Sequence, residues 1–364
     1  MSKAAELAAL IGSQTALSNR NLIINGAMQV AQRGTSETSV TSTQYANAPD
    51  RFKVSMTNGG TWTVSQSTTS PEGFSNSYKF DCTAANGSLS SDSNIQLLQR
   101  IEGQNLQQLA KGTSGAKSVT VSFYVRTNKT GTYTLELFDR DNTRTFSKTY
   151  TVSSADTWEF KSVTFAGDTL GALDNDNAVS LDVSWFLAAG TDFTSGTFSS
   201  GWASKTDANR VSSSQVNLAD STSNEWYITG IQLEVGEQAT AFEHRSFADE
   251  LARCQRYYQV TAEATSNYHV FPAQRFSSSK LFFSLPIATS MRGDPQLGSN
   301  TTGNIGLVGG NGSENNFALS DVTFVNVDAS SITVSVDVSF TPTTGRGYTG
   351  YITTGDELQF DAEL

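Results

Sequence analysis

The chain has few charged residues, cysteines and histidines, and each scarcity excludes a class of protein. Among 364 residues, Lys and Arg number 24 and Asp and Glu 35, so the net charge is −11 and the charged share only 16%. Average globular proteins carry about 25% charged residues. A nucleic-acid surface needs clustered Lys and Arg, which this acidic chain lacks. No apolar run approaches the roughly 20 residues of a membrane span, so we expect no membrane insertion.

Targeting and redox signals are also scarce. Residues 1–6 read MSKAAE, an acidic start without the apolar stretch of a secretory signal. Cys82 and Cys254 lie far apart and lack the spacing of a metal or redox motif. We expect two buried free thiols in a protein assembled in a cytosol, with one long-range disulfide as the alternative.

The residues that are abundant are those of a β protein. Phe, Tyr and Trp number 21, 11 and 5, against four Met, and aromatic side chains fit a pleated surface well. Ser, Thr, Asn and Gln supply the polar surface and favour strands and turns over helices. Hydrophobic residues make up 37% of the chain, which argues against disorder. The length suits two domains.

Residues 21–245 alternate with the period of β-strands. Apolar side chains occupy every second position in 119–125, and 132–138 follow after a turn-forming segment at 128–131. We expect these two runs to form a hairpin. Further strands are expected at 146–152, 157–165, 178–187 and 226–235. Many short strands without helices between them predict a jelly-roll β-sandwich, with Trp185 in its core.

The remaining segments complete the predicted organisation. Residues 1–20 carry a short apolar stripe at helical spacing, interpreted as an assembly or docking helix that packs on its own symmetry mates or on another protein, with a frayed terminus as the alternative. Residues 246–258 predict a connecting helix, capped by Ser246 and Asp249. Its packing face is expected to contain Phe247, Leu251, Cys254 and Tyr258. Residues 259–364 return to strands and predict a second, smaller β-sandwich, with runs at 281–285, 322–327, 331–340 and 358–364.

Motifs for catalysis are missing. The two histidines, His244 and His269, lie in different modules, and the sequence contains no G-x-S-x-G, Walker, dinucleotide or H-E-x-x-H motif. A triad assembled in space is not excluded by spacing. The run Glu243-His244-Arg245 is interpreted as a hydrogen-bonded corner where the large domain ends. We therefore expect no enzyme.

Acidic residues leave two alternatives open. Glycoside hydrolysis needs only two positioned carboxylates, and the candidates are Glu102, Glu136, Asp139, Asp141 and Asp182. The run 174–177 offers Asp174 and Asp176 as oxygen ligands for structural calcium, although Asx-rich turns also form for backbone reasons. Apart from that calcium, we expect no cofactor.

Loop aromatics are the remaining candidates for recognition. A flat apolar face with a polar edge suits the stacking of a sugar ring, and loops on a β scaffold often carry binding residues. The aromatic residues that lie among Gly, Ser and Thr are Trp202, Tyr268, Tyr348 and Tyr351. We take these four as carbohydrate-binding candidates.

Several blocks of the chain resemble one family. Residues 20–34 read RNLIINGAMQVAQRG and 48–52 read APDRF. Further blocks follow in order at 99–105, 119–137, 227–236, 242–246, 251–258 and 359–364. This series resembles bacteriophage tail-fibre and related virion appendage proteins, particularly those of marine phages. The segment 259–357 resembles them least.

The resemblance implies a jelly roll like a carbohydrate-binding module at 21–245, a connecting helix at 246–258 and a distal β domain at 259–364. It also implies a homotrimer on the virion, made in the host cytoplasm, docked through 1–20 to other tail or baseplate proteins, and carrying no catalytic residue. The distal domain becomes the candidate receptor-binding domain for host polysaccharide or lipopolysaccharide. The recurrent blocks are interpreted as corners and core, with roles for Asn25, Gly26, Arg51, Glu102, Leu233 and Val235.

Two other functions stay open at this stage. An architectural virion protein would bridge tail or head components without touching the host, and a glycan depolymerase would cleave the polysaccharide that it binds. Trimeric avidity would strengthen several weak sugar sites without new contacts, which favours attachment.

Overall fold

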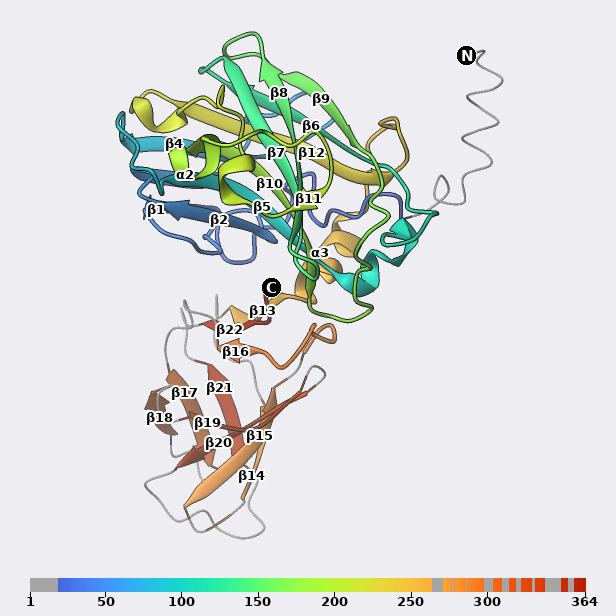
Figure 1. The fold of residues 1–364 in the computed structure, drawn as a ribbon. Coiled ribbons are helices and arrows are strands. Elements are labelled where there is room, and N and C mark those ends of the chain that lie inside the picture. Colours follow the sequence, from blue (N-terminus) through green and yellow to red (C-terminus); the bar gives the residue numbers. More distant parts are fainter. Residues whose placement is uncertain are drawn as a thin grey trace. The chain divides into compact units, whose positions relative to one another are not determined.

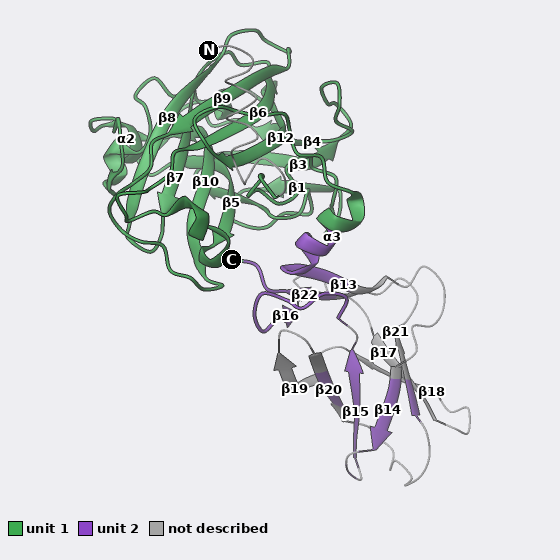
Figure 2. Ribbon diagram, turned by 90° about the vertical axis from the view of Figure 1, so that its right-hand side faces the viewer, with its two compact units in different colours: residues 1–250, 364 green, residues 251–363 purple. Residues whose placement is uncertain are grey.

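The structure is a computed structural model that divides into two compact units, residues 1–250 with 364 and residues 251–363 (Figure 2). It describes residues 19–263, 271–275, 277, 279–285, 287–297, 304–309, 314–318, 322–328, 331–337, 348–352 and 357–364. The helix predicted within 1–20 falls almost wholly outside the described residues. The predicted all-β class is confirmed.

Unit 1 is a sandwich of two six-stranded antiparallel sheets (Figure 1). Sheet A contains, in spatial order, β1 (Ser36–Val40), β3 (Thr61–Ser67), β4 (Ser77–Ala84), β12 (Glu225–Val235), β6 (Val119–Thr127) and β9 (Glu159–Phe165). Sheet B contains β11 (Ala203–Ser204), β8 (Arg144–Val152), β7 (Gly131–Asp139), β10 (Val179–Ala189), β5 (Asn94–Glu102) and β2 (Phe52–Thr57). Short helices in the connections are η2 (Gly103–Asn105), η3 (Gln107–Leu109), α2 (Thr191–Thr194), η4 (Asp207–Asn209) and η5 (Leu218–Asp220).

Large aromatic side chains from both sheets fill the core. Trp185 of β10 is fully buried, as its alternation with Leu181 and Val183 predicts, and its ring meets Phe123 of β6 with centroids 5.7 Å apart. Tyr150 of β8 meets the same Phe123 at 5.0 Å. These contacts join the two sheets directly, and edge-to-face aromatic pairs add about 0.5–1.5 kcal/mol beyond their buried area.

The predicted hairpin of 119–126 with 132–138 is wrong. Strand β6 pairs with β9 and β12 in sheet A, whereas β7 pairs with β8 and β10 in sheet B. The segment between them crosses from one sheet to the other, and Asn128 fixes it by donating to the carbonyl of Ser223 at 2.9 Å. Alternation along each strand is the same for a hairpin and for a crossover, so local pattern does not distinguish them.

The recurrent blocks form corners and core. Asn25 has a φ of 60° and its carbonyl accepts from the amide of Met28 at 2.9 Å, which is the predicted tight turn. A Cβ on Gly26 would lie 2.1 Å from the carbonyl oxygen of Ile231, so only glycine fits. Arg51, Glu102 and Leu233 are buried, and Val235 is partly buried against the core.

Helix α3 (Phe247–Gln255) begins as the sequence indicates. The hydroxyl of Ser246 accepts from the amide of Asp249 at 3.1 Å, which is an N-cap, and donates to the carboxylate of Asp249 at 2.7 Å. Cys254 is fully buried, but Phe247 is 57% exposed, so its place on the packing face was predicted wrongly. The predicted helix is also too long, because Tyr258 already begins a strand.

Unit 2 contains two antiparallel sheets. A three-stranded sheet consists of β13 (Tyr258–Glu263), β22 (Glu357–Asp361) and β16 (Gln296–Leu297). A seven-stranded sheet consists of β18 (Glu314–Ala318), β17 (Asn304–Gly309), β21 (Tyr348–Ile352), β14 (Phe271–Arg275), β15 (Lys280–Leu285), β20 (Ser331–Asp337) and β19 (Val322–Asp328). The strands expected at 281–285, 322–327, 331–340 and 358–364 are present. The end of the third, 338–340, lies outside the described residues, and the fourth ends at Asp361, earlier than predicted.

Both cysteines are buried and no disulfide joins them, as the sequence predicts for the two positions that the structure describes. Burial raises the pKa of the Cys82 thiol to about 11, which keeps it protonated and unreactive at neutral pH. No helix among the described residues is long and apolar enough to cross a membrane.

Stability is expected to fall on acidification because two partly buried carboxylates are bonded to cations and amides. Burial raises the pKa of Asp168, but the hydrogen bond from Arg144 and the Lys111 ammonium lower it further, below the ordinary 3.8. Burial also raises the pKa of Glu243, but the hydrogen bond from the Asn21 amide and the Arg245 guanidinium outweigh burial. Together they bring this pKa below the ordinary 4.5. A carboxyl group whose pKa is lower in the folded than in the unfolded protein stabilises the fold at pH values above the unfolded pKa. This stabilisation is lost as the pH falls through the unfolded and then the folded pKa.

Urea unfolding measured from pH 6 to pH 3 checks this expectation. The free energy of unfolding should hold steady down to about pH 5 and then decline. Asp168→Asn should be less stable at pH 6 and show a shallower decline. Asp50 contributes in the opposite direction, because burial raises its pKa. A stability that rises steadily between pH 5 and pH 3 would contradict the assignment.

Candidate functional site

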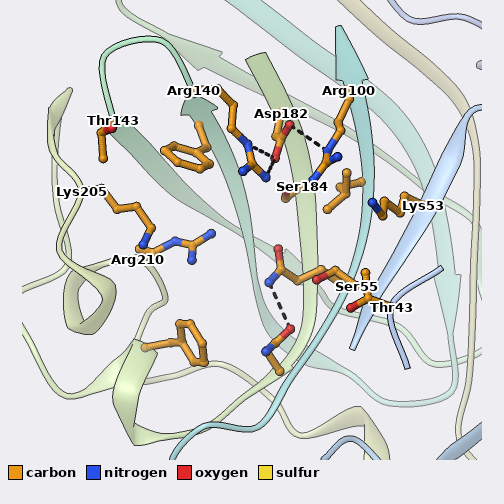
Figure 3. A pocket seen from close by; sticks show the side chains of 15 residues that line it. Thr43, Lys53, Ser55, Arg100, Arg140, Thr143, Asp182, Ser184, Lys205 and Arg210 are labelled. Carbon is orange, nitrogen blue, oxygen red and sulfur yellow. Dashed lines mark hydrogen bonds and ion pairs between the residues drawn. The ribbon is translucent and has the colours of Figure 1, made fainter. Parts of the chain in front are cut away.

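The outer face of sheet B carries a cavity of about 390 Å³ (Figure 3). Its volume lies within the range of about 300–1,000 Å³ that small-molecule sites occupy. The side chains that line it come from strands β2, β5, β7 and β10 and from the loops beside them. They are Thr43, Lys53, Ser55, Asn94, Gln96, Leu98, Arg100, Phe138, Arg140, Thr143, Asp182, Ser184, Phe193, Lys205 and Arg210.

Strand register arranges the floor of the cavity in rows. Asp182 on the central strand β10 lies between Arg100 of β5 and Phe138 of β7. One row further, Ser184 lies opposite Leu98. These positions alternate with core residues, so the strands that bury Val183 and Trp185 inward present Asp182 and Ser184 outward. Rigid strands therefore fix the floor side chains.

Asp182 is held by two arginines. Its Oδ2 accepts from Nε and Nη2 of Arg140 at 2.9 and 2.5 Å, and its Oδ1 lies 3.6 Å from Nε of Arg100. Oδ1 is buried and makes no hydrogen bond within the described part of the chain. A buried carboxylate oxygen without a hydrogen-bond donor is costly, and the nearby Arg100 guanidinium offsets part of that cost.

The loop that covers the cavity is fastened by Arg210. Its Nε and Nη2 donate to the two carboxylate oxygens of Glu136 at 2.8 and 2.6 Å, a bidentate pair. Burial opposes the charge of Arg210, but the Glu136 carboxylate outweighs it and raises the pKa of the guanidinium. Asp207 lies beside Arg210. Burial raises the pKa of Asp207, but the Lys205 ammonium lowers this pKa more strongly, so Asp207 stays ionised.

The turn between β7 and β8 carries Arg140 and is anchored from below. Asp139 is fully buried, and its Oδ1 accepts from the amide of Asn142 at 3.0 Å. Its Oδ2 is bonded to the ammonium of Lys111. The position of Arg140 at the rim thus depends on a buried ion pair.

Trp202, the one predicted sugar-binding aromatic in unit 1, does not line this cavity. Trp202 is half-buried: its Nε1 donates to the carbonyl of Ala166 at 2.8 Å, and Phe146 and the Lys111 ammonium cover its ring at 5.9 and 5.1 Å. Tyr348 is only 6% exposed. Tyr268 and the side chain of Tyr351 lie outside the described residues. None of the described candidates presents an open ring face, and their role in binding stays a prediction.

The carboxylates that the sequence offered for glycoside hydrolysis each bond to a different partner. Glu136, Asp139 and Asp182 are bonded to Arg210, Lys111 and Arg140, respectively. Glu102 accepts from Gln104 at 2.5 Å, and Asp141 accepts from the amide of Asp174 at 2.9 Å.

The calcium candidates Asp174 and Asp176 lie in an exposed loop. Asp176 uses Oδ1 to accept from the amide of Ala178 at 3.0 Å, which is a backbone turn of the kind that Asx residues form. Among the residues that the structure describes, no group of three or more His, Cys, Asp and Glu side chains is arranged to hold a metal.

The run Glu243-His244-Arg245 forms the expected hydrogen-bonded corner. Glu243 accepts from the amides of Arg20 and Asn21 at 3.3 and 2.8 Å, and Arg245 contacts it at 3.1 Å. His244 instead stacks with aromatic rings. His269, the other histidine, lies outside the described residues.

An aromatic strip on the outer face of sheet A is a second exposed feature. Neighbouring ring centroids are 4.9–5.6 Å apart along Phe160, Tyr124, Phe74, Phe242 and His244. Phe160 is 50% exposed. Gly230, with a φ of +61°, makes room for it, because a Cβ there would lie 2.7 Å from the ring of Phe74.

Sequence reasoning missed most of the cavity. Alternation places Trp185 in the core and therefore Asp182 and Ser184 on the opposite face, so two floor residues could have been found. The cationic residues Arg140, Lys205 and Arg210 lie in loops. No local pattern indicates that these three meet.

Comparison with known proteins gives similarity only to solved structures. No protein-family model matches the chain, and no curated protein has a significantly similar sequence. A putative sugar-binding protein of Bacteroides thetaiotaomicron is 12% identical with a TM-score of 0.32, over 60% of this chain and 100% of that one. The module TmCBM61, solved with β-1,4-galactotriose, is 11% identical with a TM-score of 0.28, over 60% and 100%.

A third similar structure is the enzymatically active domain of tailspike protein 4 from bacteriophage CBA120. It is 12% identical with a TM-score of 0.29, over 59% of this chain and 21% of that one. The chain thus spans about a fifth of the tailspike structure that it matches. Such low identities and TM-scores carry no information on ligand or activity, and the fold class rests on the strand pairing described above.

Proposed function

We propose that this protein is a non-enzymatic phage tail-fibre protein that attaches the virion to host surface glycans as a homotrimer, with the sheet B cavity as a sugar site. The observation that carries the proposal is the cavity itself. Short polar side chains and charged groups on strands and on the loops beside them surround a space of about 390 Å³ with two aromatic rings in its wall. Sugar recognition needs this combination of apolar ring faces and hydrogen-bond partners for hydroxyls.

Binding without cleavage is favoured by the contacts of the carboxylates. Hydrolysis of a glycosidic bond requires a carboxyl group that donates a proton and a second carboxylate beside the same bond. Asp182, the one carboxylate that lines the cavity, is bonded to Arg140, and nearby Glu136 is bonded to Arg210. Both carboxylates therefore already accept charge-assisted hydrogen bonds from arginines.

Three parts of the proposal come from the sequence resemblance. Docking through residues 1–20, trimer formation and location in the virion tail follow from the likeness to tail-fibre proteins. We also keep the prediction that 259–364 contacts the host, as a second receptor surface in addition to the cavity of unit 1. Light scattering of the purified protein should give the mass of three chains; a stable monomer would contradict the trimer.

A cavity-filling variant tests the sugar site. Ser55 lies on the edge strand β2 and lines the cavity, so Ser55→Trp should occupy the space with little strain on the core. We expect binding to extracted host polysaccharide to weaken at least about 30-fold, or about 2 kcal/mol. Ser65→Trp is the matched control, since Ser65 is a half-buried serine on β3 of the other sheet.

The outcomes separate the three functions. Saturable binding that Ser55→Trp abolishes, without release of reducing ends, supports attachment through this cavity. Binding that persists in Ser55→Trp moves the site to the aromatic strip or to 259–364. Release of reducing ends would make the protein a depolymerase, and no binding by any oligomeric preparation would favour the architectural role.

A further inference from the structure

Positive charge gathers in the cavity although the chain as a whole is acidic. The net charge of the protein is −11, yet the lining has a single carboxylate, that of Asp182. Its cationic side chains are Lys53, Arg100, Arg140, Lys205 and Arg210. A cleft lined by charge of one sign concentrates ligands of the opposite sign.

Three of these cations converge on one aromatic ring. From the centroid of Phe138, the guanidinium carbons of Arg140 and Arg210 lie 4.7 and 5.8 Å away, and the ammonium of Lys205 lies 6.0 Å away. Figure 3 shows Arg140, Lys205 and Arg210 together on one side of the cavity. We call this group the cationic wall.

The carboxylates nearby leave donors of the cationic wall unused. Arg140 gives Nε and Nη2 to Asp182, and its Nη1 makes no hydrogen bond within the described part of the chain. Lys205 contacts Asp207 at 2.6 Å, but an ammonium has three N–H donors. Asp207 itself is 52% exposed, so water screens that pair.

The opposite side of the cavity carries neutral polar groups beside Lys53. Ser55 and Gln96 lie opposite each other on β2 and β5, and Ser184 lies on the adjacent strand β10. Figure 3 shows Ser55 and Thr43 across the cavity from Lys205 and Arg210. Hydroxyl and amide groups of this kind exchange hydrogen bonds with sugar hydroxyls but do not neutralise a charge.

We infer that the cavity selects a saccharide that carries an anionic group, a carboxylate or a phosphate, with the anion on the cationic wall and the hydroxyls on the neutral polar groups opposite. This inference rests on the proposed sugar-binding role of the same cavity and specifies the class of sugar. Arginine and lysine donors bind either anion through charge-assisted hydrogen bonds. Phe138 is only 9% exposed and lies beneath the three cations, so it supports the cationic wall and is not itself a stacking surface.

Calorimetric titration of the full-length protein tests the inference. The probes are trigalacturonic acid, its fully methyl-esterified form, mannose 6-phosphate and mannose. We expect an acidic probe to bind at least about 10-fold more tightly than its neutral counterpart, with an affinity that falls as salt is raised. Preference for the uronate or for the phosphate distinguishes the two anions.

Two variants locate the effect. Lys205→Gln removes a rim charge whose partner is exposed, so it should weaken the acidic probe about 10-fold and leave the neutral probe unchanged. Arg140→Gln removes the unused Nη1 donor and should weaken the acidic probe by a similar factor. Arg126→Gln is the control, because Arg126 pairs with Asp156 on sheet A. Thermal unfolding of each variant checks that it is folded.

The results separate this inference from the proposal beneath it. Equal binding of acidic and neutral probes, or binding of the neutral probes alone, overturns the anionic class but keeps a sugar-binding cavity. Acid binding that both variants retain overturns the cationic wall as its site. If neither kind of probe binds, the inference falls, and binding of host polysaccharide that Ser55→Trp abolishes would still support the sugar site.

Discussion

Replacing Lys111 with methionine should lower the free energy of unfolding by about 3–5 kcal/mol, the cost of removing one partner from a buried ion pair. The Lys111 side chain is 5% exposed, and its ammonium is bonded to Asp139 and lies 3.1 Å from Asp168. It also donates to the carbonyl oxygen of Gly171 at 2.8 Å. Without the ammonium, the buried carboxylates of Asp139 and Asp168 lose their shared cation. Asp168 still has the guanidinium of Arg144, but Asp139 has no second cation among its contacts in the described residues.

Urea unfolding of Lys111→Met beside Lys117→Met measures this effect. Lys117 is exposed in the same connection, so its substitution should change stability by less than about 0.5 kcal/mol. Because Asp139 also anchors the turn that carries Arg140, Lys111→Met should weaken ligand binding as well. A loss below about 1 kcal/mol would show that the buried pair contributes no net stability.

Replacing Arg245 with alanine should lower the free energy of unfolding by about 3 kcal/mol. The side chain is 7% exposed and ties the beginning of the described chain to the end of unit 1. It donates to the carbonyl oxygens of Asn21 and Ile23, and contacts Glu243 and Glu250 at 3.1 and 3.3 Å. Each of these acceptors would lose a charged donor at once.

A surface arginine provides the comparison for Arg245. Arg126→Ala removes an exposed pair with Asp156, which should cost less than about 1 kcal/mol. The two variants remove the same side chain, so their difference measures the corner alone. If Arg245→Ala and Arg126→Ala lost equal stability in thermal and urea unfolding, the contacts of Arg245 would contribute no more than an exposed ion pair.

The fold class and several local features follow from sequence because they depend on neighbouring residues. Alternation along 178–187 places Trp185 in the core whichever strands lie beside it. The hydroxyl of Ser246 caps α3 because the amide of Asp249 is three residues away. The corner at Glu243 was also interpreted correctly, although its partners Arg20 and Asn21 are more than 220 residues distant.

Strand pairing was predicted less well. The turn at 128–131 has the composition of a hairpin, but it connects sheet A to sheet B. Pairing partners depend on how all strands share one core, and this information is not present in any single run. The same limit affects Trp202, whose polar neighbours indicate an exposed loop, while the fold packs its ring against Phe146.

The sequence by itself therefore determined that this is an acidic, all-β protein with buried thiols, a capped helix near residue 250 and no enzyme motif, since composition and short-range periodicity control these properties. Only the tertiary structure decided where charge gathers. Arg140 comes from the turn between β7 and β8, and Lys205 and Arg210 come from the connection after β11. They meet around Phe138 because the strands beneath them are held in register by the common core. A site made of contacts distant in sequence has no local pattern, and so it emerges only when the chain is folded.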